Sequence, residues 1–123
     1  MAQLITAPTV LHAAGTPPKT IAEFAGRLAT GTAAVSIAVM DSPPGWSEPG
    51  QQPEFDEYSI VLEGQLAADT TSGQILAEAG QALYVPAGEW VSYSTPGPEG
   101  ARYVSVCLPA FSPDTVHRDD PAR

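Results

Sequence analysis

The chain has 123 residues, of which 43% are hydrophobic, and its 14 acidic and 5 basic side chains give a formal charge of −9 at pH 7. This length and composition exclude a disordered chain and predict one globular domain, residues 1–123, with a core of its own. The negative charge would repel nucleic acid and anionic lipid, so we expect neither as a partner.

The N-terminal segment is not expected to direct the chain to a membrane. Residues 1–15, MAQLITAPTVLHAAG, lack a basic region followed by an unbroken apolar stretch, so they do not resemble a signal peptide. No segment of the chain approaches the ~18 apolar residues that a membrane helix needs. We therefore expect a cytoplasmic protein.

One short helix is predicted near the N-terminus. It is expected over residues 16–26, TPPKTIAEFAG, where Thr16 can cap the helix and the prolines suit its first turn. Ile21, Phe24 and Ala25 would share one face of this helix.

The rest of the chain predicts many short strands. Prolines (13) and glycines (11) separate short apolar runs, which is typical of β structure. Residues 71–73 and 95–100 have the composition of turns, and the tail, 114–123, is expected to be solvated. Short links between antiparallel strands predict a sandwich or a closed barrel. The expected strands are 33–40, 57–64, 65–70, 74–79, 81–86, 89–94 and 102–108.

Two runs of spaced residues carry a family resemblance. They resemble the paired motifs of the cupin family, G-x5-H-x-H-x3-E-x6-G and G-x5-P-x-G-x2-H-x3-N. The resemblance covers about residues 30–113 and is closest to small single-domain bacterial cupins. It implies an all-β fold, the double-stranded β-helix barrel, here with one short N-terminal helix. The positions that match in register are Gly45, Glu57, Gly64, Gly80, Pro86 and Gly88.

Glycines at two matched positions have a physical reason to be there. Gly64 is expected where a strand turns tightly into its hairpin partner, and Gly88 follows Pro86 in a turn that needs unusual dihedral angles. Such glycines support the fold without implying any chemistry.

The family's metal ligands are largely missing from this sequence. In cupins, two histidines and the glutamate of the first motif, with one histidine of the second, hold a metal. Here Gln51, Pro53 and Val91 occupy the histidine positions, and only Glu57 is retained. Gln51 is a weak neutral ligand and Val91 is none, so we expect no metal and no other cofactor.

The remaining histidines and the cysteine are not expected to form a site. His12 and His117 lie near opposite ends of the chain, although a tail that folds over a neighbouring barrel could bring His117 near a site. Cys107 lies in the apolar run 104–108 and cannot form an internal disulfide. It is expected to be a buried thiol and not a nucleophile, because no histidine lies near it in sequence.

The retained glutamate predicts a pocket. On the period-two rule, Glu57, Ser59 and Val61 share one strand face, and Val91 and Tyr93 share another. If Glu57 points into the barrel, as the resemblance implies, its face lines a cavity of mixed polarity, which is typical of a small-molecule site. Glu57 and Tyr93 are the candidate catalytic residues. The candidate substrate-binding residues are Gln51, Ser59, Val61, Val91, Trp46 and Trp90.

Each candidate also has a purely structural interpretation. Glu57 could be satisfied by backbone N–H groups of residues 52–55, in which case its pKa would not be raised. Tyr93 could be a core tyrosine, and Trp46 and Trp90 could be packing or rim residues.

Three functions remain open from the sequence. The first is a metal-independent isomerase, epimerase, dehydratase or cyclase that acts on a small organic molecule. In it Glu57 would be the general acid or base, and Tyr93 or Gln51 would polarise a carbonyl. The second is a non-catalytic binding or sensing module, and the third is a metalloprotein with Glu57, Gln51 and a tail histidine as ligands. By analogy with similar folds, a homodimer is expected.

Overall fold

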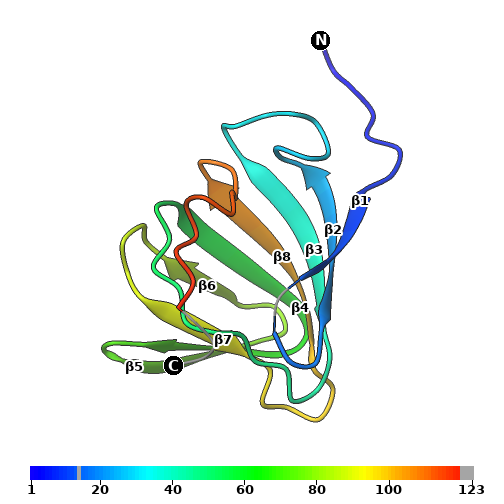
Figure 1. Ribbon diagram of the computed structural model, residues 1–123. Helices are drawn as coiled ribbons and strands as arrows, with labels where there is room; N and C mark the ends of the chain where they lie inside the picture. Colours follow the sequence, from blue (N-terminus) through cyan, green and yellow to red (C-terminus); the bar gives the residue numbers. More distant parts are fainter. Residues whose placement is uncertain (14, 120–123) are drawn as a thin grey trace.

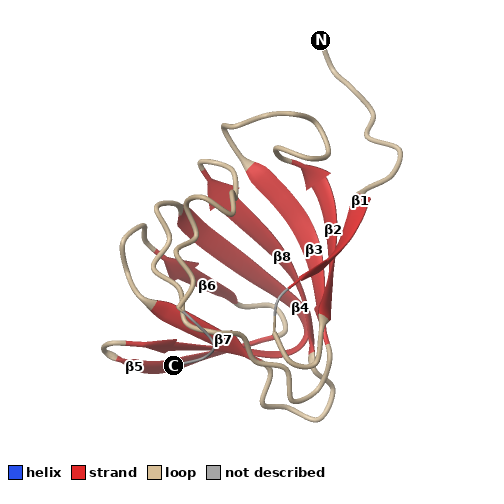
Figure 2. Ribbon diagram, in the orientation of Figure 1, coloured by secondary structure: helices blue, strands red, loops and turns tan. Residues whose placement is uncertain are grey.

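The computed structural model describes residues 1–13 and 15–119. Over these residues the protein is all β, as predicted, and Figure 2 shows strands joined by turns and loops. No helix within them is long and apolar enough to cross a membrane. The strands are β1 (Thr9–Ala13), β2 (Lys19–Ala25), β3 (Ser36–Ser42), β4 (Asp56–Thr70), β5 (Gly73–Glu78), β6 (Ala82–Val85), β7 (Val91–Ser94) and β8 (Ala101–Leu108).

Strand β4 connects two antiparallel sheets. Its first part, residues 56–64, pairs with β8 and β6, and its second part, residues 65–70, pairs with β5 and β7. Beyond β8, the larger sheet continues through β3 and β2 to β1. Figure 1 shows the larger sheet curving away from β7 and β5, which leaves an interior between the two sheets.

The change of sheet occurs at Gly64. This residue has a φ of 74°, and a Cβ atom placed there would lie 2.0 Å from the carbonyl oxygen of Gly100. A register shift against β8 between Val61 and Glu63 precedes it. The predicted tight turn into a hairpin partner is therefore wrong. The chain bends at Gly64 but continues as β4, because each part of the strand has partners in a different sheet.

The predicted helix over 16–26 is also wrong, because β2 occupies this segment. Strand β2 pairs with β1 on one edge and with β3 on the other, so its backbone groups are satisfied within the sheet. Lys19, Ile21 and Glu23 alternate on its inner face. Tertiary pairing overrides a local helical preference of this size.

The other strands follow the prediction closely. Strands β3, β5, β6, β7 and β8 lie within three residues of their expected limits, and the turn at 71–72 joins β4 to β5. The two strands expected over 57–64 and 65–70 form one continuous strand. Strand β1 has no counterpart among the predicted elements.

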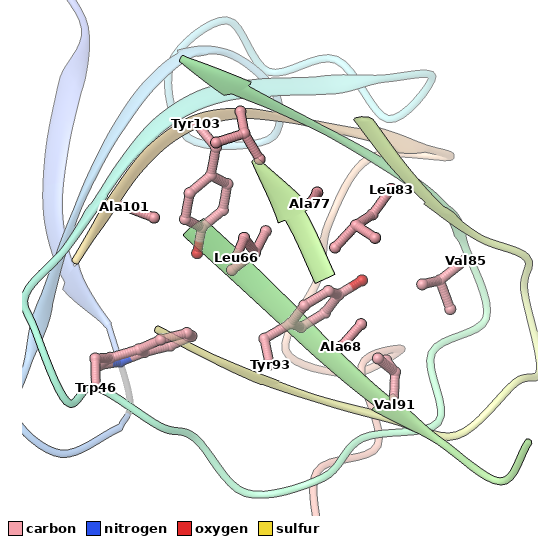
Figure 3. Close-up of a cluster of buried hydrophobic side chains, with 11 residues drawn as sticks. Trp46, Leu66, Ala68, Ala77, Leu83, Val85, Val91, Tyr93, Ala101 and Tyr103 are labelled. Carbon is pink, nitrogen blue, oxygen red and sulfur yellow. The ribbon is translucent and has the colours of Figure 1, made fainter. Parts of the chain in front are cut away.

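The main core fills the interior near the smaller sheet (Figure 3). It is built by inward apolar side chains from both sheets and by one tryptophan from the loop after β3. Its members are Trp46, Val61, Leu66, Ala68, Ala77, Leu83, Val85, Val91, Tyr93, Ala101 and Tyr103.

The segment after β8 folds back over the barrel. The N–H of Gln52 donates to the carbonyl of His117, that of Glu54 to Thr115, and that of Asp119 to Gly50, at 3.2, 2.9 and 2.7 Å. Val116 is buried against Phe55 and Cys107. Residues 114–119 thus pack on the barrel, unlike the solvated tail expected from their charge, and 120–123 lie outside the described residues.

Candidate functional site

A cavity of about 750 Å³ lies between the inner face of the larger sheet and the C-terminal segment. This volume is in the range of small-molecule sites. Every second side chain of four neighbouring strands lines it, as the pleat of a strand requires. These side chains are Lys19, Ile21 and Glu23 of β2, Ser36, Ala38 and Met40 of β3, Glu57 and Ser59 of β4, and Tyr103, Ser105 and Cys107 of β8.

Glu57 is held on the cavity wall by two hydroxyl groups. Ser105 Oγ donates to its Oε2 at 2.6 Å, and the Tyr93 hydroxyl donates to its Oε1 at 3.4 Å. Burial raises the pKa of Glu57 above its ordinary value, although the bond from Ser105 and the positive charge of Lys19 act in the opposite direction. Its partners are side chains and not the backbone N–H groups of residues 52–55. The carboxyl can therefore hold or release a proton at the cavity surface.

A buried ionic cluster lies on the same wall. Glu48 Oε2 accepts a 3.0 Å hydrogen bond from Arg118 Nη1 and lies 3.9 Å from Lys19 Nζ. Lys19 also donates to the Tyr103 hydroxyl at 3.4 Å and lies 4.5 Å from the ring centroid of Trp46. Burial alone would lower the pKa of Lys19, but Tyr103 and the neighbouring carboxylates raise it, so Lys19 keeps its charge.

Neutral donors complete the wall around Glu57. Burial raises the pKa of Tyr93 well above its ordinary value, so this residue stays a neutral phenol that can donate a hydrogen bond. Burial likewise raises the pKa of Cys107, whose sulfur lies 4.0 Å from Ser105 Oγ. The prediction of a buried thiol at this position is confirmed.

Among the described residues, Gln51, which lines the cavity, has an unpaired buried acceptor. The residue is 4% exposed, and its Oε1 has no hydrogen-bond partner within the described part of the chain. Its backbone pairs with Val91 in both directions, at 2.8 and 2.9 Å, which fixes the side chain where the loop meets β7. Ser59, also buried, is another lining residue of the cavity.

The structure thus brings four predicted site residues, Glu57, Tyr93, Gln51 and Ser59, to one cavity and places the other four elsewhere. Val61, Val91 and Trp46 lie in the apolar core and are not among the lining residues. Val91 and Tyr93 do share a face of β7, but only the tyrosine is long enough to reach the cavity. Trp90 lies at the surface, where its Nε1 donates to Asp119 Oδ2 at 3.0 Å.

Both histidines line the cavity, from opposite ends of the chain. His12 comes from β1, and His117 comes from the C-terminal segment, where its ring bonds Glu54. The tail therefore brings His117 to the cavity of its own barrel.

Four residues of this site were not predicted from the sequence: Lys19, Glu48, Ser105 and Arg118. The signal for Lys19 was its alternation with Ile21 and Glu23, which was outweighed by a helical pattern in the same residues. Ser105 sits opposite Ser59 in the pairing of β8 with β4, a register that no local pattern specifies.

The residues present do not fit the metal that the family implies. Of the four ligand positions, Val91 lies in the core, Pro53 offers no side-chain donor, and Gln51 offers a neutral oxygen. Among the described residues, no three histidine, cysteine, aspartate or glutamate side chains are grouped to hold a metal ion. Nitrogen or sulfur ligands, which transition metals prefer, are missing from the motif positions.

Comparison with solved structures supports the fold. The chain is similar to the polyketide cyclase RemF from Streptomyces resistomycificus, with 17% identity, a TM-score of 0.74 and coverage of 98% of this chain and 86% of that one. It is also similar to a predicted oxalate decarboxylase from Thermotoga maritima, with 19% identity, a TM-score of 0.72 and coverage of 88% and 98%.

Sequence comparison extends this result. A protein of Myxococcus xanthus (strain DK1622) named endoribonuclease YbeY is 45% identical over 103 residues, which are 84% of this chain and 35% of that protein. The chain therefore spans about a third of the length of the curated relative that it matches. The family model described as "Cupin domain" matches residues 38–107, more than half of the chain. The chain belongs to the cupin family.

Proposed function

We propose that the protein is a metal-independent enzyme that moves a proton on a small organic molecule bound in the barrel cavity. The observation that carries this proposal is the carboxyl of Glu57, which lines the cavity and is held by Ser105 and Tyr93. A general acid or base works best when its pKa lies near the working pH. Burial moves the pKa of Glu57 in that direction.

Glu57 would act first as the base. In its ionised form the two hydroxyl donors stabilise the negative charge, and the carboxylate takes a proton from the bound molecule. The protonated carboxyl then returns a proton to a different atom or, in an epimerisation, to the same carbon on its other face. The Tyr93 phenol donates a hydrogen bond to an oxygen that gains negative charge. Isomerisation, epimerisation, dehydration and cyclisation all need this proton transfer. The likeness to a polyketide cyclase favours cyclisation among them.

RNA cleavage, the activity named for the Myxococcus relative, is not what we propose for this chain. The chain covers 35% of that protein, and a formal charge of −9 opposes binding of a polyanion.

Hydrogen–deuterium exchange on simple ketones tests the proposal. The protein is incubated in D2O with 1-indanone or 4-phenyl-2-butanone, whose protons beside the carbonyl exchange slowly in neutral water, and exchange is followed by NMR. We expect faster exchange with the wild type and loss of the acceleration in Glu57→Gln. Glu63→Gln, an exposed change on the same strand, is the matched control and should leave it unchanged.

Two outcomes would count against the enzyme. Acceleration that survives in Glu57→Gln would remove Glu57 as the base. Ketones that bind, as judged by their NMR line broadening, without any accelerated exchange would favour the binding or sensing module instead.

A further inference from the structure

The charge around the cavity differs from that of the whole chain. The chain carries 14 acidic and only 5 basic side chains, yet three of those basic side chains line this one cavity together with both histidines. Three carboxylates line it as well. The numbers of acidic and basic side chains are therefore equal around the cavity, whereas acidic side chains are in large excess in the whole chain. The cationic side chains are Lys19, Arg27 and Arg118, and the carboxylates are Glu23, Glu48 and Glu57.

The carboxylates are already engaged by the protein. Glu23 Oε2 accepts the backbone N–H groups of Leu28 and Ala29, at 3.1 and 2.8 Å, which orders the loop after β2. Glu48 accepts from Arg118, and Glu57 accepts from its two hydroxyl donors. All three carboxylates therefore have hydrogen-bond donors within the protein, and Arg118 is likewise engaged by Glu48.

Lys19 is a buried cation whose ammonium group has N–H bonds without a hydrogen-bond acceptor in the part of the chain that the structure describes. Its ammonium group has three N–H bonds, and the residue is 6% exposed. Within the described residues it makes one hydrogen bond, to Tyr103 at 3.4 Å, while Glu48 Oε2 at 3.9 Å lies beyond hydrogen-bond distance. Buried charged donors without acceptors are costly. An anionic oxygen in the cavity would supply the missing acceptor.

Gln51 lacks a hydrogen-bond donor for its side-chain oxygen among the described residues. This oxygen is buried, and the side chain lines the same cavity. An amide oxygen can only accept, so it would be satisfied by a hydroxyl or N–H of the ligand. The lining also has an apolar part, which includes Ile21, Met40, Phe55, Phe111 and Val116.

We propose that the cavity takes a hydroxylated organic anion with an apolar body. The anionic oxygen, a carboxylate or an enolate, binds Lys19, and a hydroxyl group of the ligand donates to Gln51. The body packs against Met40, Phe55 and Phe111. This inference rests on the proposed function in using the same cavity, and it adds the chemical class of the molecule that enters.

Three naphthalene probes separate these contacts: 6-hydroxy-2-naphthoate, 2-naphthoate and 6-hydroxy-2-naphthamide. Calorimetric titration of the wild type should rank the first probe as the tightest. Lys19→Met should weaken both carboxylates by about tenfold and change the amide little, since only the charged contact is lost. Gln51→Leu should weaken the two hydroxylated probes and spare 2-naphthoate.

Arg102→Gln is the control for net charge. Arg102 pairs with exposed Asp41 at 3.5 Å and does not line the cavity, so this variant changes the charge of the chain by the same amount at a distant place. It should bind all three probes like the wild type. Arg118→Gln is a second cavity variant in case Lys19→Met melts too low to assay, and it too should weaken the carboxylates selectively.

The proposal is overturned if the wild type binds the amide as tightly as the hydroxynaphthoate, or if Arg102→Gln acts like the cavity variants. Absence of binding for all three probes at about 1 mM would overturn it as well. Glu57→Gln distinguishes this inference from the proposed function. This variant should lose proton exchange on the ketones while keeping the ranking of the probes. Failure of the exchange result would count against the proposed function alone, and failure of the ranking would count against the ligand class alone.

Discussion

Ser105 Oγ donates a 2.6 Å hydrogen bond to Glu57 Oε2 across the pairing of β8 with β4. In that register Glu57 lies opposite Cys107, so the bond runs diagonally to the next inward position of the neighbouring strand. Burial raises the pKa of Glu57, whereas the serine hydroxyl lowers it. The proton affinity of the candidate catalytic carboxyl is therefore set by two strands that are distant in sequence.

Glu57 should make folding less favourable as the pH rises. Its pKa is raised on folding, so the stability contributed by its protonated form is fully present below the ~4.3 pKa of an unfolded glutamate. That contribution is lost as the pH rises through the higher folded value. Glu57→Gln removes the loss, so its melting temperature relative to wild type should increase between about pH 4 and pH 8. Thermal melts and a carboxyl-carbon NMR titration check this, and a depressed pKa would contradict it.

Removal of the serine hydroxyl should raise the pKa of Glu57 further. Ser105→Ala deletes the donor, so we expect a higher NMR pKa and a loss of about 1–3 kcal/mol of unfolding free energy where Glu57 is ionised. Ser59→Ala is the matched control, because Ser59 is buried opposite Ser105 and the structure gives it no bond to Glu57. Equal pKa values in the two variants would show that the Ser105 bond does not hold the carboxyl.

Val91→Phe should overpack the core. Val91 is fully buried among Leu66, Ala68 and Tyr93 of the core cluster, so the larger ring should cost about 1–3 kcal/mol of stability. Ligand binding by the folded fraction should persist, because Val91 does not line the cavity. Chemical denaturation beside a naphthoate titration measures both effects. Normal stability with abolished binding would instead place Val91 in the pocket, as the motif alone implied.

Gly64→Ala should destabilise the protein by more than the cost of a positive φ alone. Steric strain at such a φ costs about 1–2 kcal/mol, and the new Cβ would also meet the Gly100 carbonyl oxygen at 2.0 Å. Gly80→Ala is the control, since Gly80 has a φ of 88° and no atom within 4 Å of an added Cβ. Denaturant midpoints compare the stability of the two variants. Equal losses of stability would mean that the backbone at Gly100 can move away from the added Cβ at little cost.

The purified protein should carry well under one equivalent of transition metal. The ligand positions hold Gln51, Pro53 and Val91, which lack the nitrogen donors that such a metal prefers. Elemental analysis after expression in metal-supplemented medium provides the measurement. A stoichiometric metal that is lost in Glu57→Gln would contradict the metal-independent mechanism.

Most strands and the family were predictable because their signals are local. Alternation in the segments of β3, β4 and β8, with turn residues between them, predicts strands whatever they pair with. The spacing of Glu57 from Gly45 and Gly64 is likewise a property of one short segment. The same alternation correctly placed Glu57 and Ser59 on one face.

The family, most of the strands and the absence of the metal-binding histidines can therefore be read from the amino-acid sequence, because all of them depend on residues close together along the chain. That residues 19–25 form a strand depends instead on tertiary pairing, because both edges of this segment hydrogen-bond to strands from other parts of the chain. The composition of the site also depends on the tertiary structure. Glu48 meets Arg118, 70 positions away, and Lys19 meets Tyr103, 84 positions away. No local pattern encodes such contacts, because they exist only once β2 and the C-terminal segment have packed around one cavity.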